Sequence, residues 1–391
     1  MGAYLNLLRK PALMRVFVSQ LLARFPLGML SMGILIFIQS TTQQYGLAGI
    51  IVGSLSIGEA VMVPLTSRLS TRFDTRKFLL WIGFANAIAI AALVIAPHSF
   101  AFYVVIALVA GLTTPPFAAV SRALFPLLAD EEETRSLFAL DTAAQEILWI
   151  IGPVLAAVSA GIYPAAPLLL CSAFTVAGTL WFVTSPALQT VRLPLSQSKF
   201  GYVLKYKSLV ITLLVMFVLV ASWTSFEVGL LSYFEADAFW MGMAIALSGA
   251  GSLTGALLLG NKKLGLLSTI GVLLITALGT TAFLFSSDSP VLFSAALFVS
   301  GFGFAPGIAS LLLMVSHAVR SEDSAEAFGW IATAALLGGA CGTALGGFIT
   351  DAYDFQTTFA IAAVLAFASA GVLVISRTAG PIPGLSNTSA K

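Results

Sequence analysis

Long apolar stretches alternate with short polar connections along the whole chain. Each stretch is long enough for an α-helix to cross the hydrocarbon core of a bilayer, which takes about 20 residues. One polar connection, residues 186–207, is much longer than the others and separates six stretches from six. The pattern predicts an all-α membrane protein whose twelve transmembrane helices lie near residues 13–39, 47–67, 78–96, 100–122, 136–160, 166–185, 208–234, 239–260, 264–285, 291–315, 326–350 and 356–376.

Basic residues are found in alternate connections. No Lys or Arg occurs on one side, in residues 40–46, 97–99, 161–165, 235–238, 286–290 and 351–355. The other side carries Arg68, Arg72, Arg76, Lys77, Arg122, Arg135, Lys262, Lys263 and Arg320. By the positive-inside rule the basic side faces the cytoplasm. We therefore expect a multi-pass protein of a bacterial cytoplasmic (inner) membrane, with its N- and C-termini in the cytoplasm.

Composition narrows the class of protein further. Apolar residues make up 59% and charged residues 9% of the 391 residues, whereas a soluble domain has about 25% charged residues. The polar segments hold no nucleophile triad, metal-ligand spacing or phosphate-binding loop, so we expect neither an enzyme nor a cofactor or metal. No basic surface favours nucleic acid as a partner. Cys171 and Cys341 lie inside spans, where we interpret them as apolar packing residues.

The two sets of six spans have glycine, proline and phenylalanine at matching positions. At an offset of 190 positions Gly111 aligns with Gly301 and Gly152 with Gly342; the same offset aligns Pro116 with Pro306 and Phe138 with Phe328. An offset of 193 aligns Gly58 with Gly251. We interpret this as an internal duplication that gives two pseudo-symmetric six-helix bundles. The predicted organisation is an N-terminal bundle (1–185), a cytoplasmic linker (186–207), a C-terminal bundle (208–376) and a disordered cytoplasmic tail (377–391).

The connection between spans two and three carries a family pattern. From Ser67 it reads SRLSTRFDTRK and resembles the signature G-x-x-x-D-R-x-G-R-[RK]-[RK] of the major facilitator superfamily. Arg72, Arg76 and Lys77 fit this signature. Ser67 stands for its first Gly and Thr71 for its Asp, so the acid that latches the cytoplasmic gate in the family is missing.

The resemblance extends over the whole chain and is greatest to the twelve-span drug/proton antiporter type. That type carries G-x-x-x-G-P-x-x-G-G in span five, of which this chain keeps Gly152 and Pro153, and we expect this pair to kink the span. The family also has a pattern in span four that begins with an Arg, and this chain has Ala107 at that position. The resemblance implies transport by alternating access, in which two bundles rock about a central site. Expected gating residues are Ser67, Arg72, Arg76, Gly152 and Pro153.

Ionisable residues inside the spans point to proton coupling. A charge at the bilayer centre costs about 2.5–3.5 kcal/mol, so such residues face a cavity or a partner. Arg24, Glu59 and Glu146 lie at similar depths. We expect Arg24 to hold Glu59 ionised and Glu146, away from water, to take up and release protons. Asp141 is a further candidate, paired with Arg122 at the cytoplasmic mouth. Alternatively, these groups form a static polar knot, or Arg24 binds an anionic group of a substrate.

Aromatic residues beside polar neighbours are candidates for a substrate site. Such a lining binds hydrophobic or amphipathic solutes through apolar area, with a few polar anchors. The predicted lining residues are Phe25, Gln39, Thr113, Thr114, Gln145, Trp149, Trp223, Phe226, Glu227, Phe304 and Trp330.

The leading hypothesis is a secondary active transporter that couples proton entry to the export of a small hydrophobic or amphipathic compound. Two other transport functions fit the same pattern: a proton-linked uptake carrier and an uncoupled facilitator for a small metabolite. A membrane sensor that moves no solute is the alternative from another class. The expected partners are a small-molecule substrate, protons and the lipid bilayer, and we expect a monomer.

Overall fold

The computed structural model describes residues 10–42, 45–95, 99–191, 193–195, 197–234, 238–260, 262, 264–285 and 289–378. Within them, twelve helical segments are long and apolar enough to span a membrane, which confirms the prediction. From residue 379 on, the predicted tail lies outside the described residues. The first half contains α2 (Pro11–Thr42), α3 (Tyr45–Arg72), α4 (Thr75–Ile95), α5 (Phe100–Leu112), α6 (Phe117–Leu128), α7 (Glu131–Ile162) and α8 (Ala166–Val183).

The second half repeats the arrangement after a short helix in the linker, α9 (Pro186–Thr190). Its helices are α10 (Lys207–Tyr233), α11 (Ala238–Leu259), α12 (Leu266–Ala282), α13 (Pro290–Phe302), α14 (Phe304–Ala318), α15 (Ser324–Ala352) and α16 (Phe355–Thr378). Three single turns of 3₁₀-helix are η1 (Tyr202–Lys205), η2 (Phe283–Phe285) and η3 (Ser321–Asp323).

Spans four and ten are interrupted in the described chain. Span four breaks between Leu112 and Phe117, at the pair Pro115 and Pro116, and span ten breaks at Gly303. Proline has no N–H to donate and clashes with the preceding turn, which accounts for the break in span four. Helix α7, in contrast, continues without interruption through Pro153.

Equivalent glycines make equivalent helix crossings in the two halves. A Cβ atom on Gly111 of α5 would lie 2.1 Å from the carbonyl oxygen of Leu55 on α3. In the second half, a Cβ atom on Gly301 of α13 would lie 1.9 Å from the carbonyl oxygen of Ser248 on α11. Only glycine permits backbones to approach this closely. The crossings agree with the duplication inferred from the offset of 190 positions.

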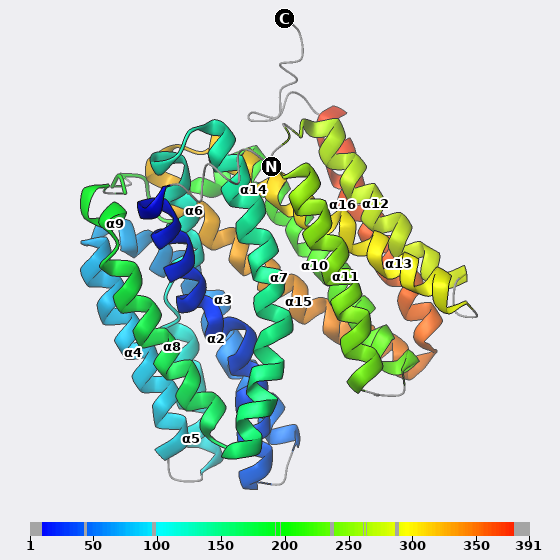
Figure 1. Ribbon diagram of the computed structural model, residues 1–391, viewed down its shortest axis with the longest axis horizontal. Helices are drawn as coiled ribbons and strands as arrows, with labels where there is room; N and C mark the ends of the chain where they lie inside the picture. The colour runs from blue at the N-terminus through cyan, green and yellow to red at the C-terminus, as the bar shows by residue number, and fades with distance from the viewer. Residues whose placement is uncertain are drawn as a thin grey trace, which may run out of the picture.

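The two halves meet at one end of the molecule. We call this the basic end, because it carries Arg68, Arg72, Arg76, Lys262 and Arg320. The first and second halves contact each other through α3 with α15, α7 with α11 and α14, and α6 with α15. In Figure 1 the ribbons of the two halves diverge toward the opposite end.

The apolar core includes one large cluster shared by the two halves and a separate cluster within each half. Its largest cluster crosses between the halves and includes Phe125 and Phe138 from the first half and Leu311 and Phe328 from the second. Phe138 and Phe328 occupy matching positions in the repeat, and their ring centroids are 5.9 Å apart. Beyond this cluster, each half has a separate core, one around Met29 to Cys171 and the other around Phe226 to Ala362. Burial therefore joins the halves at the basic end.

Candidate functional site

A buried ion network crosses the first half between α2, α6 and α7. Asp141, with no exposed surface, receives Arg24 Nη1 on Oδ1 at 2.5 Å and Arg122 Nε on Oδ2 at 2.8 Å. Gln20 Nε2 donates to the same Oδ1 at 3.0 Å. Gln145 Oε1 accepts from both guanidinium groups. The side chains of Arg24 and Arg122 are 2% and 8% exposed, so two buried cations share one buried carboxylate.

This network corrects the expected pairing of Arg24. We expected Arg24 to hold Glu59, but the structure pairs it with Asp141. The contact between Arg122 and Asp141 was expected, although it is buried rather than solvated at the cytoplasmic mouth. With two arginines and one aspartate, the network has an excess of one positive charge. In addition, Arg24 Nε is buried without a hydrogen-bond partner among the described residues.

Glu59 lies apart from this network. It is 9% exposed on α3, and its Oε1 accepts a hydrogen bond from Thr114 Oγ1 at 3.3 Å. Thr114 belongs to the break between α5 and α6. The break therefore supplies a hydroxyl donor to a carboxyl for which the described residues provide no basic partner.

Glu146 and Glu227 form the third group of ionisable residues. Both side chains are half-buried, and their carboxyls lie within electrostatic range of each other although they belong to different halves. Trp223 lies one turn before Glu227 on α10, and the two side chains are neighbours. No basic residue pairs with Glu146 in the described part of the chain.

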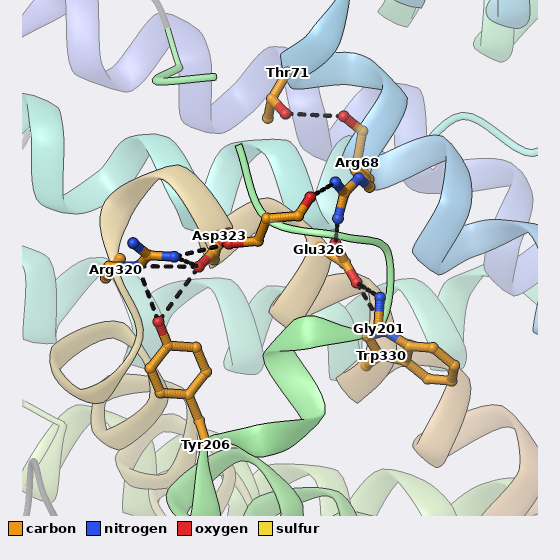
Figure 2. Close-up of polar contacts among 9 residues, drawn as sticks. Arg68, Thr71, Gly201, Tyr206, Arg320, Asp323, Glu326 and Trp330 are labelled. Atoms are coloured by element: carbon orange, nitrogen blue, oxygen red, sulfur yellow. Dashed lines mark hydrogen bonds and ion pairs between the residues drawn. The ribbon is translucent and has the colours of Figure 1, made fainter. Parts of the chain in front are cut away.

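A second ion pair closes the basic end, as Figure 2 shows. Arg68 Nη1 on α3 lies 2.6 Å from Glu326 Oε2 on α15. Arg68 Nη2 donates to the carbonyl oxygen of Ser198 in the linker. Glu326 is 1% exposed, and its other carboxylate oxygen accepts from the Gly201 backbone N–H at 2.7 Å and from Trp330 Nε1 at 3.4 Å. The linker thus binds both members of an ion pair that joins the halves.

Thr71 occupies the position of the acid in the family pattern. Its hydroxyl donates to the Arg68 carbonyl oxygen at 2.8 Å, within its own helix (Figure 2). An ion pair between the halves is nonetheless present at this end. The basic partner is Arg68 on span two, and the acidic partner is Glu326 on span eleven.

Arg320 binds the linker near the ion pair of Arg68 and Glu326. Its Nε donates to Tyr206 Oη at 3.1 Å, and its Nη2 donates to Asp323 Oδ2 at 3.0 Å and Ser198 Oγ at 2.8 Å. The hydrogen bonds to Tyr206 and Asp323 raise the pKa of Arg320 above its ordinary value. Figure 2 shows Arg320, Tyr206 and Asp323 in contact with one another.

Helices α3 and α15 approach each other closely beside the ion pair. A Cβ atom on Gly329 would lie 2.6 Å from Ser67 Oγ and 2.9 Å from Pro64 Cα. One turn further on, Thr333 Oγ1 donates to the Ala60 carbonyl oxygen at 2.9 Å. Ser67, predicted to act in gating, therefore lies at the interface between the halves.

The other predicted gating residues lie elsewhere. Arg76 Nε donates to the Val183 carbonyl oxygen at 3.0 Å, inside the first half. Arg72 lies beside Arg76 in the lining of a cavity described below. Gly152 has a packing role, because its Cβ atom would lie 2.4 Å from the Gly28 carbonyl carbon of α2.

The residues predicted to line a central site lie in different surroundings. Phe226 is a core residue in this conformation, since it is 1% exposed and packs on Phe283 and Phe359. Trp330 belongs to the closed basic end, with its ring 5.9 Å from that of Phe200. Trp149 is exposed, Phe304 is buried, and the remaining half-buried residues are Phe25, Gln39, Thr113, Thr114, Gln145, Trp223 and Glu227.

Sequence reasoning missed Gln20 in the first network and Glu326 at the basic end. Gln20 and Arg24 are four residues apart, as are Asp141 and Gln145, so each pair occupies one face of its helix. That matching spacing is a signal for the first network. Glu326 had no such signal, because its partner Arg68 is 258 positions away.

Comparison with known proteins agrees with this architecture. The Major Facilitator Superfamily model matches residues 16–277 and 263–390. No curated protein sequence matches this chain. Among solved structures, a bacterial homologue of the iron transporter ferroportin in an outward-facing state has a TM-score of 0.76, 12% identity, and coverage of 93% of this chain and 99% of its own.

Two further structures have the same fold. The human organic anion transporter MFSD10 (TETRAN) has a TM-score of 0.74 and 14% identity, over 92% of this chain and 98% of its own. The E. coli fucose:proton symporter FucP has a TM-score of 0.69 and 15% identity, over 95% of this chain and 98% of its own. Since the family model matches nearly the whole chain, which folds into twelve spans in two repeated halves, the protein belongs to the major facilitator superfamily of membrane transporters.

Proposed function

We propose that the protein is a proton-coupled exporter of a small hydrophobic or amphipathic compound, of the drug/proton antiporter type. The observation that carries this proposal is the isolation of Glu146. Arg24 and Arg122, the basic residues within the first-half network, are both held by Asp141. Glu146 is therefore a half-buried carboxyl for which the described residues provide no cation.

A carboxyl in this setting suits reversible protonation. Burial penalises its charged form, while contact with water on one side of the membrane allows the proton to leave. Glu146 lies on α7, which contacts α11 and α14 of the other half. Ile150, one turn later, packs on α11, where a Cβ atom on Gly249 would lie 2.7 Å from Ile150 Cδ1. Movement of the halves would therefore change the surroundings of Glu146.

The side of the membrane from which the central site is reached follows from the closure of the basic end. If this end is cytoplasmic, as the positive-inside rule indicates, the closure through Arg68 and Glu326 seals the cytoplasmic side. The conformation is then outward-facing, like the state named for the ferroportin homologue. In this state Glu146 would be loaded with a proton from outside, and inward opening would release it.

Aromatic contacts near the carboxyls support an apolar substrate. The Trp223 ring lies 5.7 Å from the Phe304 ring in the second half, and the Phe25 ring lies 5.0 Å from the Phe174 ring in the first. Glu227 is the polar group beside Trp223. Area burial with few polar anchors favours hydrophobic and amphipathic compounds.

The test is transport of ethidium and of the neutral dye Nile red in reconstituted vesicles with an imposed proton gradient. We expect dye movement that stops when an uncoupler collapses the gradient, and a Glu146→Gln variant that no longer responds to the gradient. Glu132→Gln is the matched control, because Glu132 is an exposed acid on the same helix.

Other outcomes would overturn the proposal. Dye movement that is equal with and without the gradient, in both wild type and Glu146→Gln, would identify a facilitator. Gradient-driven accumulation in the opposite direction would identify an uptake carrier. Absence of movement for a wide panel of compounds would favour a sensor.

A further inference from the structure

A cavity of about 370 Å³ opens at the basic end, away from the interface between the halves. It lies between the turn that joins α3 to α4, the helix α6, and α9 with the linker that follows it. Its polar wall contains Arg72 and Arg76, and its apolar wall contains Leu188 and Leu193. Its volume falls in the range of small-ligand sites, about 300–1,000 Å³.

Both arginines have N–H groups that donate to no acceptor in the described part of the chain. Arg76 is anchored through Nε to the Val183 carbonyl oxygen at 3.0 Å, which leaves its two terminal nitrogens for another acceptor. Arg72 is exposed and has no hydrogen-bond or ion-pair partner in the described part of the chain. Arginine matches phosphate oxygens in geometry and charge.

One acid also lines the cavity. Asp74 Oδ1 accepts the Lys77 backbone N–H at 3.0 Å, so this carboxylate caps the first turn of α4. The described lining residues have an excess of one positive charge, and Lys77 adds another basic group next to them. An anionic occupant is favoured over a cationic one.

The position of the cavity identifies the kind of anion. Arg72 ends one membrane span and Thr75 begins the next, so the opening lies at the membrane surface. Phe73 and Leu195, two more lining residues, are 59% and 52% exposed. Apolar side chains exposed next to arginines are typical of the boundary between lipid headgroups and acyl chains.

We propose that this cavity binds the phosphate headgroup of an anionic phospholipid from the leaflet at the basic end. The phosphate lies between Arg72 and Arg76, and the glycerol end contacts Phe73 and the linker leucines. Basic pockets between transmembrane helices bind anionic headgroups in this way. The linker that forms one wall continues to Ser198 and Gly201, so the lipid would also secure the segment that holds the closed basic end.

The test is native mass spectrometry and thermal unfolding of the purified full chain, titrated with phosphatidylglycerol or with phosphatidylcholine. We expect phosphatidylglycerol to bind and to raise the unfolding temperature more than phosphatidylcholine. The Arg72→Gln and Arg76→Gln changes should weaken binding roughly fivefold each. The matched control is Lys207→Gln with Lys262→Gln, which removes two exposed charges at the same end but outside the cavity.

A second variant covers the case in which the arginine variants do not fold. Leu195→Asp places a carboxylate at the exposed rim and should also weaken phosphatidylglycerol binding at least fivefold. Equal binding of both lipids, or equal weakening in the lysine control, would overturn the proposal. Stabilisation by soluble glycerol 3-phosphate as large as that by the lipid would assign the site to a free phosphate compound instead. Neither readout depends on transport.

Discussion

Arg68 and Glu326, 258 positions apart in the chain, form an ion pair of 2.6 Å that joins the two halves at the basic end. The backbone of the linker binds both residues, through Ser198 and Gly201. The central linker is consequently part of the closure and not merely a tether between two bundles. Opening of this end must break the ion pair and separate the two residues that the linker binds.

The first prediction concerns this ion pair. Arg68→Gln should destabilise the closed conformation by about 2 kcal/mol, or roughly 30-fold, because Glu326 loses a charged hydrogen-bond donor. The measurement is maleimide labelling of Thr333→Cys, a buried position at the interface, with Cys171 and Cys341 replaced by Ser. Labelling should be faster in Arg68→Gln and unchanged in Lys262→Gln. Equal rates in all three proteins would show that the ion pair does not hold the gate.

The second prediction concerns the crossing of α3 and α15. Gly329→Ala should prevent full closure, because the new Cβ would lie 2.6 Å from Ser67 Oγ. Ser67→Gly should partly rescue it, since the 2.9 Å approach to Pro64 Cα would remain. Gly347→Ala on the same helix is the control, because that position has nothing within 4 Å. The same labelling assay at Thr333→Cys measures closure, and a tight gate in Gly329→Ala would contradict the expectation.

The third prediction concerns the shared carboxylate. Asp141→Asn leaves two buried arginines without an anion and should destabilise the fold by about 3–5 kcal/mol. Adding Arg122→Gln should recover part of the loss, because one unpaired charge is removed. Thermal unfolding in detergent measures both variants. If the double variant were less stable than Asp141→Asn alone, charge imbalance would not explain the effect.

The fourth prediction concerns the crossing of α2 and α7. Gly152→Ala should lower stability by about 1–3 kcal/mol, because the added methyl group meets the Gly28 backbone and the helices must separate. Gly161→Ala lies on the same helix in open space and should leave the unfolding temperature nearly unchanged. Equal stability of the two variants would show that α2 and α7 can shift without loss.

The sequence by itself determined the number of spans and the repeat. Both follow from local physics, since about 20 apolar residues suffice to cross a bilayer and each helix satisfies its own backbone. The close crossings at Gly111 and Gly301 could be anticipated for the same reason, because glycine at matching positions marks close backbone approach. The breaks in spans four and ten lie at or within three residues of Pro116 and Pro306, the prolines that align in the repeat.

The sequence anticipated the pair Arg122–Asp141, but tertiary structure decided the partners of Arg24 and Glu326. Sequence position gives the depth of Arg24 in the membrane but not the rotation of α2 or the identity of its neighbour. The contact of Gly28 with Gly152 sets α2 against α7, and this brings Arg24 to Asp141 rather than to Glu59. Likewise, only the approach of the two halves brings Glu326 to Arg68. Pairing inside a membrane depends on helix packing, which no local pattern specifies.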